Sequence, residues 1–482
     1  MTHGAAIGPS DLVRQVAREH PGRCAVVDGD LRLSYAALDG RVSGAARALL
    51  DSGLTAGDRV ALQLGTGVDF VLLYLAVLRA GMVVVPVNPS YTGTEADRLV
   101  ADSGAARHFD ATTARAFLAD AKEAADPAQD RGGAELAALM YTSGTSGKTR
   151  GAMLSAGALM ANLEQIAAIE PPLLLPSDVL FVPLPLTHIF GLNAGLGMAL
   201  HAGATLVLAD RFDAGETLAT MAAERVTAVL GVPGQYTAWL AHPAMTLGFA
   251  SVRFAMSGSA TLGRGVVDGF AAAGITVHDG YGLTEAAPVV AINALGDGRA
   301  EPRVGSVGLP LPGVEVELRD SDGDEVDEGD PGRLFVRGGN LFAGYWPDGS
   351  DGPGEDGWFG TGDIACADAE GRLHLVGRTS DLVIVNGFNV YPAEVEAVLA
   401  AEPGVAEVAV VGVPDEHTGE AVRAYVVPAV GSLLDPDQLR EAAARSLARF
   451  KLPNVIDVVQ TLPHTVTGKI MKWQLERGAS AE

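Results

Sequence analysis

A loop rich in serine, threonine and glycine follows an apolar segment in the first third of the chain. The segment 139–154 reads LMYTSGTSGKTRGAML, so several hydroxyls and backbone N–H groups are available to phosphate oxygens. Residues 147–149 match the end of a Walker A loop, but that motif needs glycine at 142, where this chain has Thr142. From these residues alone, a phosphate-binding loop and a flexible turn without ligand both remain open.

A second glycine-containing loop, TVTGKI, carries Lys469, one of only five lysines in the chain. When a carboxylate attacks a phosphate, two anions approach each other, and a cation that bridges them lowers the barrier. Lys469 could supply that cation. Its spacing alone favours a solvated surface lysine.

Alternating strands and helices must position these loops. Residues 59–87 read as a strand, a helix closed by glycine and a fully apolar strand, and similar alternation continues to about residue 280. From about 303, short alternating strands with Asp-Gly and Pro-Gly turns predict a small antiparallel β subdomain. We expect a large α/β domain at 1–378, with layered, mostly parallel sheets, and a smaller, mobile α+β domain at 379–482.

Composition excludes several classes of function. A net charge of −25 disfavours nucleic acid and anionic lipid as partners, and no apolar run is long enough to insert into a membrane. Cys24 and Cys366 lie far apart and suit a reducing compartment, and the N-terminus has no signal-peptide pattern. We therefore expect a soluble cytoplasmic protein. The acidic run at 320–330 lacks the ligand periodicity of a calcium loop and predicts a solvated turn.

Seven segments in a fixed order carry a family resemblance: YTSGTSGKTRGAML, VPLPLTHIFGL, DGYGLTE, RLFVRGGNLFAGYW, WFGTGD, GRTSDLVIVNGFNVYPAEVE and LPHTVTGKI. They resemble the core motifs of the adenylate-forming superfamily, which includes acyl-CoA synthetases, peptide-synthetase adenylation domains and luciferases. The resemblance runs from about residue 10 to residue 475. It implies an AMP-forming acid–thiol ligase that uses ATP, Mg²⁺ and coenzyme A, with wording closest to fatty-acyl and related acyl-CoA ligases.

The resemblance also implies a nucleotide site. The loop that holds the β- and γ-phosphates would be Thr142, Ser143, Gly144, Thr145, Ser146 and Gly147, with Thr145 also near the metal. The DGYGLTE segment would bind the nucleotide through Asp279, Gly280, Tyr281 on adenine, Thr284 on the α-phosphate and Glu285 on Mg²⁺. Asp363 would accept hydrogen bonds from the ribose hydroxyls, assisted by Arg378. Gly258, Ser259 and Ala260 would pass along the adenine and acyl pocket.

For catalysis, the resemblance assigns Lys469 to the adenylation step and implies a rotation of the small domain between the two half-reactions. Gly387 would then approach the thiol tunnel. His188 would lie between the acyl and thiol channels, although a satisfied core histidine is an equal interpretation. The expected pocket walls, at 188–195, 232–239, 258–260 and 280–282, suggest a medium-sized apolar or aromatic acid.

Two positions depart from the family pattern. The phosphate loop usually ends in Pro-Lys-Gly, but residues 149–151 are Thr-Arg-Gly, and arginine changes the donor geometry. The expected hinge position carries Ser380 instead of Asp or Lys. Three alternatives therefore stay open: an acceptor other than CoA, such as a carrier protein or an amine; an acid other than a carboxylate; and a binding protein without catalysis.

Overall fold

The computed structural model describes residues 8–122, 133–143, 149–294, 305–385, 388–415, 418–464 and 470–479. Its contacts divide the chain into two compact units. Unit 1 comprises Met1–Val316 and Val336–Phe359, and unit 2 comprises Glu317–Phe335 and Gly360–Glu482. These limits differ from the boundary expected at residues 378 and 379, and the functional division into domains stays a prediction.

A nine-stranded sheet forms one half of unit 1, and its central strands are parallel. The strand order is β14-β13-β12-β11-β10-β8-β9-β1-β2, with parallel pairing from β12 to β1 and antiparallel pairing at both edges. The strands are β1 (Cys24–Asp28), β2 (Leu31–Ser34), β8 (Val179–Val182), β9 (Thr205–Leu208), β10 (Ala228–Gly231), β11 (Phe254–Ser257), β12 (Val277–Gly282), β13 (Val289–Ile292) and β14 (Leu309–Pro310). The predicted α/β class with mostly parallel sheets is confirmed.

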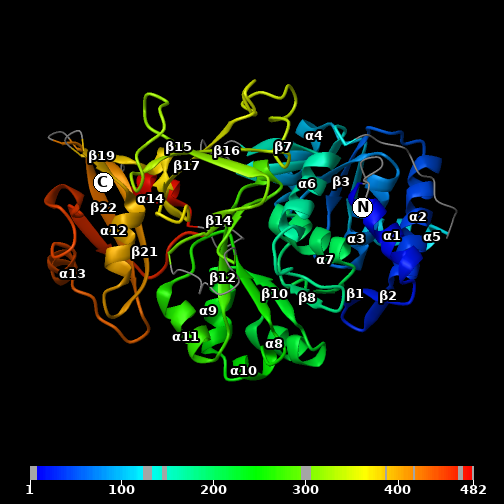
Figure 1. Cartoon of the computed structure of the whole chain (residues 1–482), viewed down its shortest axis with the longest axis horizontal. Helices are drawn as coiled ribbons and strands as arrows, with labels where there is room; N and C mark the ends of the chain where they lie inside the picture. Colours follow the sequence, from blue (N-terminus) through cyan, green and yellow to red (C-terminus); the bar gives the residue numbers. More distant parts are fainter. Residues whose placement is uncertain are drawn as a thin grey trace. The chain divides into compact units, whose positions relative to one another are not determined.

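Helices α8 (Ala214–Ala223), α9 (Pro233–Ala241), α10 (Met245–Gly248) and α11 (Arg264–Ala272) lie beside this sheet, in green in Figure 1. Their aromatic side chains pack in a core with the apolar strand residues. Trp239 and Tyr236 are fully buried there and meet edge to face at 5.2 Å between ring centroids. The core thus fixes the sheet from one side.

A second, five-stranded sheet completes unit 1 in the order β5-β3-β4-β6-β7. The expected strand–helix–strand at 59–87 is present as β3 (Arg59–Gln63), α3 (Val68–Arg79) and β4 (Val83–Pro86), with β3 and β4 parallel. The other strands are β5 (Arg107–Asp110), β6 (Leu136–Ser143) and β7 (Thr149–Ser155). The nearby helices are α1 (Pro9–Glu19), α2 (Tyr35–Asp51), α4 (Gly93–Ser103), α5 (Ala111–Asp120), α6 (Ala156–Ala167) and α7 (Met198–Ala202).

Arg79, at the end of α3, ties α1 and α2 to this sheet. Its side chain donates to the Ser10 carbonyl at 2.8 Å and to Ser43 Oγ at 2.8 Å, and it lies 2.7 Å from Asp39 Oδ1. It also donates to the Asp39 carbonyl at 3.1 Å, and because only 3% of Arg79 is exposed, these partners replace water around its charge.

Replacing Arg79 with methionine should lower the free energy of unfolding by about 3–5 kcal/mol, because the Asp39 carboxylate and two buried acceptors lose their donor. Thermal unfolding of the unit 1 transition measures the loss. Arg18→Met on exposed α1 surface is the matched control and should leave that transition unchanged. Equal melting temperatures for the two variants would contradict the assigned role.

Two further sheets follow in the sequence. The order β15-β16-β17-β18 joins β15 (Val314–Arg319), β16 (Gly332–Gly338), β17 (Phe359–Ala367) and β18 (Leu373–Arg378). The last sheet has the order β20-β19-β22-β21, with β23 paired to β22, and comprises β19 (Val383–Val385), β20 (Phe388–Val390), β21 (Val405–Asp415), β22 (Gly419–Pro428) and β23 (Val455–Val458). The predicted small β subdomain and the predicted terminal α+β region are both confirmed.

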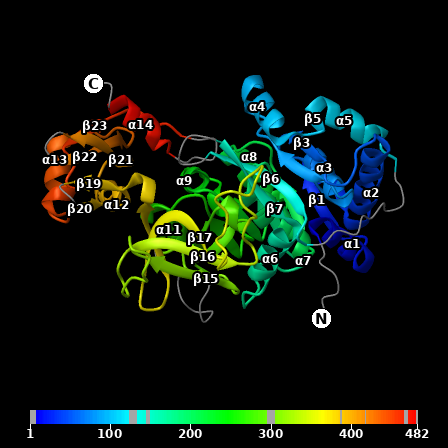
Figure 2. The same cartoon turned by 90° about the horizontal axis from the view of Figure 1, so that it is seen from above.

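Helices cover both faces of this last sheet, as Figure 2 shows in orange and red. Side chains of α12 (Pro392–Ala400) and α13 (Pro436–Ala443) pack with Val410 and Val422 on one face. Leu475 of α14 (Lys472–Ala479) packs with the alternate residues, such as Val411, on the other. Among the residues the structure describes, no helix has the length and apolarity needed to cross a membrane.

Candidate active site

The carboxyl ends of two neighbouring parallel strands of unit 1 bring two predicted segments together. Ser257 ends β11 and lies in register with Asp279 of β12, so residues 258–260, which follow β11, and residues 279–282, which end β12, lie at the same edge of the sheet. Ligands of α/β sheets bind at such an edge, because the strand-to-helix connections diverge there. The structure therefore places the expected adenine and acyl segments side by side.

The loop after β11 is held against the segment that follows His188. A Cβ atom on Gly258 would lie 2.9 Å from the Phe190 ring, so only glycine allows this approach. The next residue, Ser259, is exposed and has φ +72°. This backbone conformation is strained for any residue other than glycine. Phe190 begins η1 (Phe190–Gly197), a π-helix, and π-helical turns recur at functional sites.

His188 is half-buried and lies just before η1. Burial lowers its pKa, because desolvation disfavours the imidazolium, and the Phe190 N–H donates to Nδ1 at 3.4 Å. The side chain is therefore a neutral imidazole at neutral pH. That state suits both a channel residue and a satisfied core histidine, and its role in thiol access stays a prediction.

The turn that carries Thr284 and Glu285 is η2 (Thr284–Ala286), between β12 and β13. Glu285 is 9% exposed, and its Oε1 accepts a hydrogen bond from the Tyr345 hydroxyl at 2.5 Å. Its backbone carbonyl accepts from the N–H of Phe342 at 2.8 Å. Both ends of this residue are thus fixed before any ligand binds.

Three buried asparagines hold the residues that follow Glu285. Asn340 Nδ2 donates to the Ala286 carbonyl at 2.8 Å, and Asn193 Nδ2 donates to the Ala287 carbonyl at 2.7 Å. Asn162 Nδ2 donates to the Val289 carbonyl at 2.7 Å, and Asn162 Oδ1 accepts from the Val289 N–H at 3.1 Å. These amides make the turn a rigid support for the carboxylate.

The supporting role of these asparagines was not predicted, although Asn193 lies within the expected pocket wall at 188–195 and Asn340 lies within the RLFVRGGNLFAGYW motif. Asn193 and Asn162 each stand alone in a helical run of apolar residues, and a lone amide among apolar residues is the signal that could have found them. Tyr345 was also missed, although it lies inside the expected RLFVRGGNLFAGYW motif.

Glu285 fits the Mg²⁺ ligand that the resemblance implies. Its Oε2 makes no hydrogen bond within the described residues, and no group of three or more acidic, histidine or cysteine side chains gathers there as a metal site. Magnesium bound with ATP usually takes one or two carboxylates together with phosphate oxygens and waters. A single fixed carboxylate is the donor set that such a shared ion requires.

Asp279 is a buried carboxyl group in β12 with a strongly perturbed pKa. Burial raises its pKa to about 7, although the backbone N–H of Leu262 opposes the shift. Its Oδ1 has no hydrogen-bond partner among the described residues. This carboxyl group therefore carries its proton near neutral pH and also holds the loop after β11.

Replacing Asp279 with asparagine should remove a pH-dependent loss of stability. The folded chain keeps the proton up to about pH 7 and the unfolded chain releases it near 3.8, so stability falls as pH rises through this window. The shift of about three pKa units corresponds to roughly 4 kcal/mol as an upper value. We expect the melting temperature of Asp279→Asn to rise above that of the unchanged protein from pH 4 to pH 8, whereas exposed Asp268→Asn should not. Parallel curves would contradict this assignment.

Within unit 2, the structure pairs Asp363 with Arg378. These residues lie opposite each other on β17 and β18, and Arg378 Nε is 3.0 Å from Asp363 Oδ1. Asp363 is 7% exposed, and its backbone N–H donates to Thr361 Oγ1 at 3.1 Å. The two residues expected at the ribose are thus brought together, and their contact with ribose stays a prediction.

The strands that flank the phosphate loop form a hairpin. Thr142 of β6 lies in register with Arg150 of β7, and Ser143 with Thr149. The expected residues Gly144, Thr145, Ser146, Gly147, Gly387 and Lys469 lie outside the described residues. Their assignments rest on the sequence.

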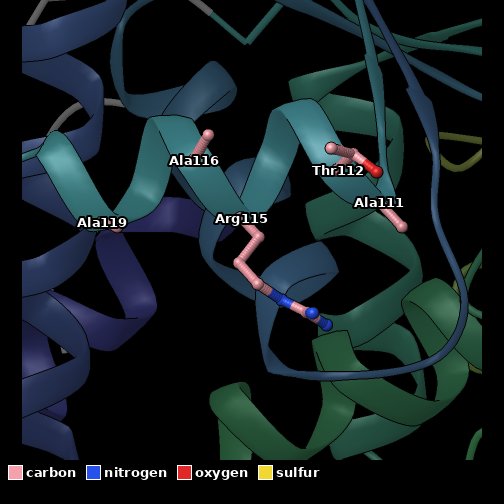
Figure 3. A pocket seen from close by; sticks show the side chains of 5 residues that line it. All are labelled: Ala111, Thr112, Arg115, Ala116 and Ala119. Carbon is pink, nitrogen blue, oxygen red and sulfur yellow. The ribbon is translucent and has the colours of Figure 1, made fainter.

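A hollow also lies along α5, lined by Ala111, Thr112, Arg115, Ala116 and Ala119 (Figure 3). Among the described residues that line it, the charged one is Arg115, whose Nε is 4.0 Å from Asp69 Oδ2. None of these described lining residues is expected to do chemistry. The candidate site is therefore the edge formed by β11, β12 and η2.

Comparison with known proteins gives matches along the whole chain. The model of a family described as AMP-binding enzyme matches residues 13–346, and that of the AMP-binding enzyme C-terminal domain matches residues 394–469. A feruloyl-CoA synthase of Amycolatopsis sp is 36% identical over 479 residues, which is 96% of this chain and 97% of that protein. A long-chain-fatty-acid–CoA ligase of Yersinia pestis is 34% identical over 484 residues, which is 88% of this chain and 85% of that protein.

Among solved structures, ATP-bound MatB from Rhodopseudomonas palustris superimposes with a TM-score of 0.90 at 33% identity. The superposition covers 98% of this chain and 99% of that one. The similarity therefore extends over both units and over the segments that carry the site.

Proposed function

Because the chain belongs to the AMP-binding enzyme family, we propose that it is an AMP-forming acid–thiol ligase that converts a carboxylic acid to its CoA thioester. The observation that carries this proposal is the match of the C-terminal family model to residues 394–469, which ends at Lys469. A chain that kept only a nucleotide site would not need this lysine. Relatives that match over nearly their full length are named as CoA synthases and ligases.

In the first half-reaction, a carboxylate oxygen of the acid attacks the α-phosphorus of ATP. The bond to the departing pyrophosphate breaks, which leaves an acyl-adenylate. Glu285 would hold Mg²⁺, which neutralises phosphate charge when bound. Thr284 would contact the α-phosphate, and Lys469 would neutralise the two anions as they meet.

In the second half-reaction, the sulfur of the CoA thiol attacks the acyl carbonyl carbon. The bond from that carbon to the AMP oxygen breaks, AMP leaves with its electron pair, and the thiol proton is released. We infer that the small domain rotates between the steps and brings Gly387 to the thiol channel. Neutral His188 would border that channel without adding charge to it.

For the acid, we propose a medium-sized apolar or aromatic carboxylate. The named relatives act, by their names, on ferulate and on long-chain fatty acids. In this chain, Phe190 of η1 is apolar and lies beside the loop at Gly258, and Leu192 follows it in the same buried segment. A pocket of this kind favours an apolar acid over a charged one.

An acid-dependent ATP–pyrophosphate exchange screen tests this function without assuming an acceptor. We expect exchange with a subset of aromatic and fatty acids, and AMP release only when CoA is added. Exchange with no acid in a broad panel would overturn the proposal. If exchange occurs but a carrier protein or an amine gains the acyl mass while CoA does not, the acceptor is wrong and the adenylation step stands.

A further inference from the structure

Arg150 occupies the position where the family resemblance leads us to expect lysine. Its contacts explain why this chain has arginine there. Its Cζ lies 3.7 Å from the centroid of the Tyr345 ring, and its Nη2 lies 2.7 Å from Asp351 Oδ2. A guanidinium group is planar, so it can stack on a ring and bond a carboxylate at its edge at the same time. A lysine ammonium is a point charge without a plane to stack.

Backbone hydrogen bonds hold the segment that contains Tyr345 between β7 and η2. The Ala343 N–H donates to the Met153 carbonyl at 2.9 Å, and the Trp346 N–H donates to the Gly151 carbonyl at 2.8 Å. The segment 343–346 therefore runs along β7, next to Arg150. One residue earlier, the Phe342 N–H donates to the Glu285 carbonyl, so the same segment contacts both β7 and η2.

A tight turn brings Asp351 back to this segment. Gly344 has φ +99°, and a Cβ atom there would lie 2.1 Å from the Gly349 carbonyl oxygen. The Tyr345 N–H donates to the Ser350 carbonyl at 3.0 Å. The turn thus places the carboxylate of Asp351 and the ring of Tyr345 on the same guanidinium.

We propose that Tyr345 is a positioning residue for the Glu285 carboxylate, and that Arg150, held by Asp351, fixes the Tyr345 ring. This inference rests on the proposed function, because it takes Glu285 as the ligand of Mg²⁺ bound with ATP. The phenol occupies Oε1 and leaves Oε2 for the cation. Side chains from two distant parts of the sequence, Arg150 on one hand and Tyr345 with Asp351 on the other, would thus orient one carboxylate.

Calorimetric titration of ATP, once with excess Mg²⁺ and once with EDTA, tests the inference without any acid. We define the Mg²⁺ gain as the affinity for ATP with excess Mg²⁺ divided by the affinity for ATP with EDTA. In Tyr345→Phe we expect this gain to fall about tenfold, because the carboxylate loses a charge-assisted hydrogen bond, with affinity in EDTA unchanged within about twofold. In Arg150→Lys the gain should fall less, by about threefold.

Tyr141→Phe is the matched control. Tyr141 also donates its hydroxyl to a carboxylate, that of Asp102, at 2.6 Å, and it lies on neighbouring β6. Losing that bond should leave the Mg²⁺ gain unchanged. If Tyr345→Phe fails to fold, Arg150→Gln carries the same test, because it removes the stacked cation and keeps the phenol.

Two results would overturn the inference: a Mg²⁺ gain in Tyr345→Phe that equals the unchanged protein, or an equal loss of affinity with and without Mg²⁺, which a merely structural role produces. Failure of the proposed function looks different. In that case the unchanged protein still shows the Mg²⁺ gain and Tyr345→Phe still loses it, but no acid supports pyrophosphate exchange.

Discussion

Replacing Lys469 with alanine should slow acyl-adenylate formation by roughly 10²–10³-fold, the usual cost of removing one group that stabilises transition-state charge. The reason is electrostatic: two anions meet at the α-phosphorus, and this ammonium is the cation that the family pattern assigns to them. Single-turnover formation of acyl-AMP measures the effect. Thioester formation from preformed acyl-AMP should proceed at nearly the unchanged rate, because that step creates no pyrophosphate.

Lys472 offers a matched control three residues along the chain. Its Nζ lies 2.7 Å from Glu396 Oε1, so its charge is already used within unit 2. Lys472→Ala should leave both half-reactions close to the unchanged rates. Equal losses in both half-reactions for Lys469→Ala would refute the separation of roles.

Replacing Asp363 with alanine should raise the KM for ATP by roughly 100-fold. A fixed carboxylate that accepts from two ribose hydroxyls contributes two charge-assisted hydrogen bonds, each worth about 1.5–3 kcal/mol. The substitution also leaves Arg378 without the carboxylate that now lies 3.0 Å away. Equilibrium binding of AMP, which needs neither acid nor metal, checks the same loss.

Glu370→Gln is the control for this experiment. Glu370 follows β17 in the turn toward β18, and its half-exposed side chain lies 3.3 Å from Arg372 Nε. Removing its charge should not alter AMP binding. If Asp363→Ala binds AMP as tightly as Glu370→Gln does, the ribose assignment is wrong.

The local features of this fold could be predicted from the sequence. The βαβ unit at 59–87 could be predicted, because its first strand has an apolar centre, its second strand is fully apolar and its helix is followed by glycine. The Asp363–Arg378 pair was found through its motifs, and the two residues face each other because β17 and β18 form one hairpin. In both cases the partners are close in sequence.

Long-range partners could not be predicted. Asp351 and Arg150 are 201 residues apart, so the exchange of lysine for arginine had no visible reason in the sequence. Asn193 supports Ala287 from 94 residues away, so its partner could not be identified even though the lone amide stands out in an apolar run. The limits of unit 2, which takes in 317–335 before 360–482, depend on tertiary contacts.

The π-helical segment was equally hidden. Its sequence, FGLNAGLG, is apolar or small on every side and buried throughout, so no periodicity distinguishes one helical geometry from another. The positive φ of Ser259 is also invisible to pattern reasoning, because serine rarely adopts it.

Segment η1 imposes a constraint on engineering this protein for new acids. Its first residue, Phe190, packs on the loop at Gly258, while Asn193 three positions later supports the backbone beside Glu285. Under the proposed function, substitutions at 190–197 that change acid specificity should also disturb the turn that carries Glu285 unless Asn193 and its bond to Ala287 are kept. Libraries that vary Phe190 and Leu192 with Asn193 held constant should yield altered selectivity with intact turnover far more often than libraries that vary all three.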